Sequence, residues 1–204
     1  HATADDIRYI VENAESRAVL VDDEFAPVAT EALDAAGLPA GMRFGTGAAV
    51  GFIPLADLRR GQPVTRPDSS VAGQVMQYTS GTTGRPKGVR RALNPGKSAD
   101  AAILEMSWLL SVFGVSPGAG AHLVTAPMYH SAVHSLSHAA LHYGQTVALM
   151  EKWTAESCLE QIARHRITTS HMVATHFHRL LQLPEATRRV ADVSSLTHVI
   201  HGAV

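Results

Sequence analysis

The sequence predicts an α/β fold of mostly parallel sheets flanked by helices, and two observations carry this prediction. From about residue 98 onward, short apolar segments of strand length alternate with longer segments of helical periodicity. Helices long enough to cross back over a sheet separate these strand-like segments, which favours parallel pairing with both faces covered. A chain of 204 residues can form one large domain or two small ones.

The first elements are predicted from their end signals and their apolar pattern. Residues Thr3–Asp6 have the form of a capping box with Asp in place of Glu, which predicts a helix through about Asn13. An apolar strand is expected at 18–21, and a second helix from about Phe25 to Ala36. Residues 41–51 are rich in glycine and predict no regular element.

Residues 61–73 contain proline, glycine and serine and predict a surface linker. We therefore expect an α/β portion at 1–60 and an α/β subdomain at 74–204. In that subdomain the apolar segments predict strands at 75–78, 122–126, 146–150, 167–173 and 197–200. The segments of helical periodicity predict helices at 98–113, 131–143, 154–165 and 175–183. Because the last strand lies so close to Val204, we expect an internal piece of a longer protein, truncated at its C-terminal end.

The segment from Thr79 to Gly88 is the most informative part of the chain, with the sequence TSGTTGRPKG. Glycines let backbone N–H groups turn toward an anion, hydroxyls donate further hydrogen bonds, and Lys87 supplies a positive charge. Pro86 precedes the lysine and Gly88 follows it, so this is not a Walker A loop. The composition predicts a loop that wraps phosphate rather than an ordinary surface turn.

This segment resembles the signature loop of the adenylate-forming (AMP-binding) superfamily, which includes acyl-CoA synthetases, adenylation domains and luciferases. The resemblance extends from Ala4 to Ala203 and implies the large N-terminal domain of an ATP-dependent carboxylate–CoA ligase. It implies that ATP, Mg²⁺ and coenzyme A take part, with a fatty-acid-like or other carboxylic acid as substrate. It also implies nucleotide-binding roles for Thr79, Ser80, Gly81, Thr82, Thr83, Gly84, Lys87, His201, Gly202 and Ala203. Lys87, Thr82 and Thr83 are the expected catalytic residues, because they can stabilise the leaving pyrophosphate.

Two segments after predicted strands are candidates for contact with the other parts of the substrate. Tyr129 and His130 follow a strand, and ligands bind at the carboxyl ends of parallel strands. The resemblance implies that both line the acyl pocket, whereas the alternative is a partly buried loop pair. Residues 201–203 resemble the superfamily's strand-end turn that packs against adenine, with an ordinary tight turn as the alternative.

The remaining reactive side chains predict no further site. Four histidines at a spacing of four lie around one helix, so that at most two or three could converge on an ion: His130, His134, His138 and His142. No Glu stands beside any of them as in metalloprotease helices, so we expect structural histidines and no metal site. Cys158 is expected to be a small buried hydrophobe.

Composition excludes several classes of partner. The chain has 17 basic and 18 acidic residues and no long basic run, so nucleic acid is not expected. No apolar stretch approaches the length of a membrane span. The single cysteine excludes an internal disulfide and fits a reducing compartment, so the predicted location is cytoplasmic. A homo-oligomer is possible, and the sequence does not decide the oligomeric state.

Two other functions stay open at this point. An adenylation domain would share the loop but load an acyl or aminoacyl group onto a carrier protein. A nucleotide-binding fragment without catalysis would share it too. The family's Mg²⁺-binding acid, ribose-binding aspartate and C-terminal lysine are expected beyond Val204, so we expect these 204 residues alone to be inactive.

Overall fold

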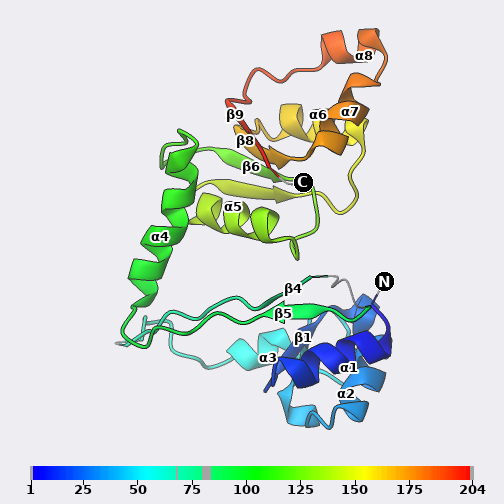
Figure 1. Cartoon of the computed structure of the whole chain (residues 1–204), viewed down its shortest axis with the longest axis vertical. Helices are drawn as coiled ribbons and strands as arrows, with labels where there is room; N and C mark the ends of the chain where they lie inside the picture. Colours follow the sequence, from blue (N-terminus) through cyan, green and yellow to red (C-terminus); the bar gives the residue numbers. More distant parts are fainter. Residues whose placement is uncertain (1, 68, 80–83, 203–204) are drawn as a thin grey trace. The chain divides into compact units, whose positions relative to one another are not determined.

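The computed structural model describes residues 2–67, 69–79 and 84–202, and it divides into two compact units, His1–Leu93 and Asn94–Val204. In both units short strands alternate with helices (Figure 1). The expected α/β fold of mostly parallel sheets flanked by helices is confirmed. Among the described residues, no helix combines the length and apolar character that crossing a bilayer requires.

The first unit contains a three-stranded parallel sheet in the order β1-β2-β3 and an antiparallel pair, β4 and β5. Its elements are α1 (Ala4–Asn13), β1 (Val19–Val21), a 3₁₀ turn (Asp23–Phe25), α2 (Ala26–Ala35), a second 3₁₀ turn (Ala40–Met42), β2 (Arg43–Gly45), β3 (Ile53–Pro54), α3 (Leu55–Arg59), β4 (Gln77–Thr79) and β5 (Lys87–Val89). The expected capping box is confirmed. The Thr3 hydroxyl accepts from the Asp6 amide at 3.2 Å, and the Asp6 carboxylate accepts from the Thr3 amide at 2.9 Å.

Strand β2 lies within residues 41–51, whose glycine-rich sequence did not indicate an element. Its glycine serves close packing, because a Cβ at Gly45 would lie 2.5 Å from Ala49 and 3.1 Å from Phe52. The buried Arg43 side chain donates to the Leu38 carbonyl at 3.0 Å through Nε, which ties the strand to the end of α2. Tertiary contacts, rather than local pattern, form this strand.

Strand β5 was not expected either, because the sequence assigns Lys87 and Gly88 to a loop. It pairs antiparallel with β4, and the hairpin is bonded to the end of α1. The Tyr78 hydroxyl lies 2.7 Å from Asn13 Oδ1, and Arg90 donates to the Ala14 carbonyl at 3.3 Å. These bonds group the hairpin with the first unit, so the compact units divide after Leu93 rather than at residues 61–73. The assignment of domains stays a prediction.

The second unit is a four-stranded parallel sheet in the order β7-β6-β8-β9. Its elements are α4 (Ala99–Val112), β6 (Ala121–Val124), α5 (Ser131–His142), β7 (Thr146–Leu149), α6 (Ala155–Arg164), β8 (Thr169–Met172), α7 (Ala174–Leu181), α8 (Glu185–Val190) and β9 (His198–His201). The expected strands and helices are present with shifted ends. Helix α8 was missed, since Pro184 ends the preceding segment and also precedes a new helix. His201 is the last residue of β9 rather than a residue after it.

Two apolar clusters lie on opposite faces of this sheet. Helices α4 and α5 cover one face, around Leu110 and Leu136, and α6 and α7 cover the other, around Leu123 and Ile162 (Figure 1). Cys158 is fully buried in the second cluster, and this burial raises the pKa of its thiol. The thiol is therefore part of the core, as expected. Because helices cover both faces of the sheet, we expect polar site residues at the carboxyl ends of its strands, where ligands bind in parallel sheets.

Candidate functional site

In the first unit, Thr79 is the last residue of β4, and it lies opposite Lys87, the first residue of β5. Residues directly opposite in an antiparallel pair point to the same face, so the hydroxyl and the ammonium group share one side of the hairpin. Both residues are exposed. The expected phosphate-binding residues between them, Ser80, Gly81, Thr82 and Thr83, lie outside the described residues.

Two glycines of the motif have distinct structural reasons. Gly84 has φ +86°, a left-handed conformation that other residues adopt only with strain. Gly88 lies opposite Tyr78, and a Cβ there would lie 2.8 Å from Tyr78 Cζ and 2.3 Å from Met76 Cε. Gly84 therefore shapes the turn, whereas Gly88 makes room for an aromatic ring.

We expect Gly88→Ala to destabilise the first unit by about 1–3 kcal/mol, because the added methyl group overlaps the Tyr78 ring. The flexible end of Met76 can move aside, but the ring is held by its hydroxyl bond to Asn13. Urea unfolding measures the loss. Gly73→Ala is the matched control, because a Cβ there meets nothing within 4 Å. Equal losses in the two variants would contradict the steric explanation.

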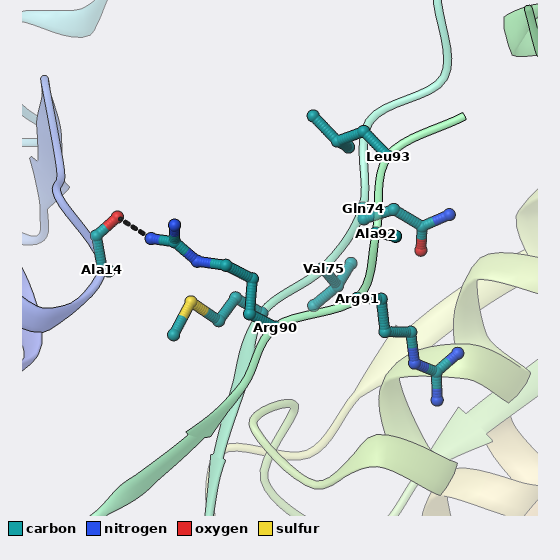
Figure 2. A pocket seen from close by; sticks show the side chains of 8 residues that line it. Ala14, Gln74, Val75, Arg90, Arg91, Ala92 and Leu93 are labelled. Carbon is teal, nitrogen blue, oxygen red and sulfur yellow. Dashed lines mark hydrogen bonds between the residues drawn. The ribbon is translucent and has the colours of Figure 1, made fainter. Parts of the chain in front are cut away.

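A groove of about 600 Å³ runs along the same hairpin. It is lined by Ala14, Gln74, Val75, Met76, Arg90, Arg91, Ala92 and Leu93. Figure 2 shows the Arg90 guanidinium reaching the Ala14 carbonyl, while the Arg91 side chain points away from it. The Arg85 guanidinium lies 5.2 Å from the centre of the Tyr9 ring, so a second arginine also contacts α1. These contacts fix the hairpin and do not identify a ligand.

In the second unit, the carboxyl edge of the sheet carries the other predicted site residues. Tyr129 and His130 lie between β6 and α5, with ring centres 4.6 Å apart, and both are exposed. His201 ends β9 and Gly202 follows it, whereas Ala203 lies outside the described residues. Since β6, β8 and β9 run parallel, these residues lie at one edge, with the end of β8 between them. Their roles stay predictions.

Two residues at this edge were not predicted from the sequence. The Thr125 hydroxyl donates to the His171 carbonyl at 2.7 Å, and His171 Nε2 lies 3.1 Å from the Gly202 carbonyl oxygen. Burial lowers the pKa of His171, which favours the neutral imidazole. The signal that could have indicated them is a run of polar residues, Thr169–His171, in a strand that is buried throughout.

Three of the spaced histidines lie in α5, and His130 precedes it. His134 and His138 have ring centres 4.0 Å apart, and burial together with the neighbouring histidines lowers the pKa of His138. In the ranges 2–67, 69–79 and 84–202, no group of three or more His, Cys, Asp or Glu residues is placed to hold an ion. We assign none of the described residues to Mg²⁺.

The model of the AMP-binding enzyme family matches residues 1–204. Over 113 residues the chain is 33% identical to 2-succinylbenzoate–CoA ligase of Bacillus pumilus, covering 52% of this chain and 20% of that protein. Over 156 residues it is 28% identical to 4-coumarate–CoA ligase 1 of Oryza sativa subsp. japonica, covering 74% of this chain and 25% of that protein. The chain thus spans about a fifth to a quarter of the length of these relatives.

A solved structure supports the same fold. The inhibitor-bound N-terminal domain of FACL13 from Mycobacterium tuberculosis superposes with a TM-score of 0.74 at 23% identity, covering 100% of this chain and 48% of that one. At this identity the likeness concerns the fold alone. The family match extends over the whole sequence, including the TSGTTGRPKG motif, so the chain belongs to the AMP-binding enzyme family.

Proposed function

We propose that the intact protein is an ATP-dependent carboxylate–CoA ligase. The observation that carries this proposal is the pairing of Thr79 with Lys87 at the end of a hairpin that bears the TSGTTGRPKG motif. This arrangement offers a hydroxyl and a positive charge on one face, which suits the phosphates of ATP. The relatives named as CoA ligases support coenzyme A as the acceptor.

The proposed reaction has two steps. A carboxylate oxygen of the acid attacks the α-phosphorus of ATP, and the bond to pyrophosphate breaks to leave an acyl-adenylate. The thiol of coenzyme A then attacks the acyl carbonyl, and AMP leaves. In the first step negative charge grows on pyrophosphate, and Lys87 with the hydroxyls of Thr79, Ser80, Thr82 and Thr83 would stabilise it. Bound Mg²⁺ would neutralise further phosphate charge.

The strand ends of the second unit supply the proposed contacts to adenine and to the acid. We assign His201, Gly202 and Ala203 to the adenine side, where the absence of a bulky side chain at Gly202 lets a flat base approach the backbone. We assign Tyr129 and His130 to the acyl side. Tyr129 is 72% exposed, which leaves its ring surface free to contact an apolar acid.

The proposed location is the cytoplasm. The sole cysteine, Cys158, is a buried core residue and forms no disulfide within the chain, which suits a reducing compartment. ATP and coenzyme A, the proposed co-substrates, are used there. Fractionation of cells that produce the intact protein would test the location.

The test of the proposed function is acid-dependent exchange of pyrophosphate into ATP by the intact enzyme, followed by addition of coenzyme A. Exchange and an acyl-CoA product are the expected results. Exchange without a thioester, but with acylation of a carrier protein, would favour an adenylation domain. ATP binding without exchange for a panel of fatty and aromatic acids would reject the ligase and leave a nucleotide-binding protein.

We expect His130→Ala to change the preference among acids by about tenfold, while the KM for ATP stays within about twofold, because a pocket wall acts on differential acyl binding. Exchange rates over an acid series of increasing chain length measure this. His142→Ala is the matched control, since it removes an exposed histidine at the other end of α5. A raised KM for ATP with unchanged acid preference would instead assign His130 to the nucleotide site.

A further inference from the structure

We propose that His171 is a positioning residue that holds the backbone of Gly202 at the nucleotide edge of the second unit. The proposal rests on the proposed function, because Gly202 is the residue expected to lie against adenine. His171 is 5% exposed, so its own contact with a ligand is not required. It would act through the carbonyl group that its imidazole binds.

The backbone of His171 is fixed on both sides. It lies in β8, between β6 and β9, with Val124 and Ile200 as its register partners. The Thr125 hydroxyl, just past the end of β6, donates to its carbonyl at 2.7 Å. Thr125 is itself 4% exposed, so water competes little for this bond. The imidazole therefore projects from a backbone position that is paired with a strand on each side.

The imidazole in turn reaches Gly202, which lies just past the end of β9. Its Nε2 is 3.1 Å from the Gly202 carbonyl oxygen. A carbonyl oxygen only accepts, so Nε2 carries the hydrogen and donates it. Thr125, His171 and Gly202 thus form a directed chain of two hydrogen bonds across three strand ends, and the last bond holds a residue that the strand ladder no longer includes.

The surroundings of Gly202 leave room for a ligand. A Cβ built on Gly202 would meet no atom of the described residues within 4 Å, so none of them occupies the space on this side of the backbone. An open backbone segment beyond a strand end needs a fixed anchor if it is to present a constant surface to a base. Misplacement by about 1 Å at such a surface is costly in binding and rate. His171 supplies that anchor from the buried side.

The test compares three variants of the intact enzyme in pyrophosphate exchange, with thermal unfolding recorded for each. His171→Phe keeps a ring but loses the donor, and we expect its KM for ATP to rise about tenfold, the usual effect of losing one buried hydrogen bond. His171→Gln places an amide donor near the position of Nε2, and we expect its KM within about threefold of the wild type. For both, the KM for the acid should stay nearly constant.

Ser170→Ala is the matched control. Ser170 is the neighbouring residue of β8, is fully buried, and donates to the Leu123 carbonyl at 2.9 Å. Its loss should lower the unfolding temperature without changing the KM for ATP. An unchanged KM in His171→Phe, an equal rise in Ser170→Ala, or no rescue by glutamine would each overturn the proposal, because they would leave only a structural role.

Two further measurements keep the outcome decisive. If His171→Phe does not fold, His171→Asn replaces it, since the shorter amide does not reach the carbonyl and should raise the KM where glutamine does not. If the wild type shows no exchange with any acid, the proposed ligase function is rejected. Calorimetric titration with ATP then tests the role of His171 by comparing the affinities of the variants. Equal ATP affinity in the wild type and the donor-free variant, or no ATP binding by the wild type, would overturn the role of His171.

Discussion

Replacing Lys87 with alanine in the intact enzyme is expected to slow acyl-adenylate formation by about 30- to 1000-fold. A charge-assisted contact that strengthens as pyrophosphate leaves is worth about 2–4 kcal/mol of barrier. The Lys87 side chain is exposed, so its loss removes little packing. The unfolding temperature should therefore change by no more than about 2 °C. Acid-dependent pyrophosphate exchange measures the rate, and a thermal melt measures the stability.

The control for this prediction is Lys152→Ala, which removes another exposed lysine, after β7 in the second unit. Its exchange rate should equal that of the wild type. Lys87→Arg is informative as well, because it keeps the charge but changes the shape of the donor, and we expect an intermediate rate. Unimpaired exchange in Lys87→Ala would remove the residue from the catalytic set.

Acidification is expected to destabilise the second unit through His122. This residue is 1% exposed in β6, and its Nδ1 lies 2.9 Å from the Thr169 hydroxyl oxygen. The Thr169 hydroxyl donates to Gln145 Oε1 at 3.3 Å, so its oxygen accepts from the imidazole and Nδ1 carries the hydrogen. Burial chiefly, with a smaller effect of His171, lowers the pKa of His122 from 6.5 to about 4.

The sign of the pH dependence follows from that pKa. Between about pH 6.5 and pH 4 the unfolded chain binds a proton at this histidine and the folded chain does not, so protonation favours unfolding. The stability is complete above about pH 6.5 and falls as the pH approaches 4, by about 3 kcal/mol in total. Urea unfolding at a series of pH values measures the free energy of unfolding across this window.

His122→Asn isolates the contribution, because the amide of asparagine lies near the position of Nδ1, can still bond to Thr169 and does not titrate. We expect a flatter pH dependence in this variant. Other groups of this unit whose pKa values are lowered contribute to the remaining slope, among them His171, His176 and Asp192. Equal slopes in the wild type and His122→Asn would contradict the assignment.

Local pattern was sufficient for most of the fold. The capping box at Thr3 predicted the start of α1, and the alternation after residue 98 predicted the parallel sheet, because helices separate the successive strands there. Strand β5 could not be predicted in this way. Its residues Lys87 and Gly88 have loop-like composition, and they form a strand because the hairpin is bonded to the distant α1. Tertiary contacts override weak local preference at such positions.

The residues of the candidate site were predictable from the sequence where they lie together in one segment. The motif identified Lys87 and Thr79, although only the strand register shows that they lie opposite each other. The link from His171 to Gly202 joins residues 31 positions apart, and it depends on the pairing of β8 with β9. No local signal contains that pairing. The sequence contributed only the polar character of β8.

The strand order of the second unit determines at which stage of synthesis each contact of the sheet can form. Strand β6 pairs with β7, the next strand of the chain, and also with β8, which follows one helix later still. The ribosome releases the chain from its N-terminus, and nearby segments close at a lower entropic cost than distant ones. A nascent chain that ends after β7 therefore holds His122 without its Thr169 partner. The edge formed by Thr125, His171 and Gly202 is complete only after β9 has emerged, so the proposed nucleotide contact is among the last features of this unit to mature.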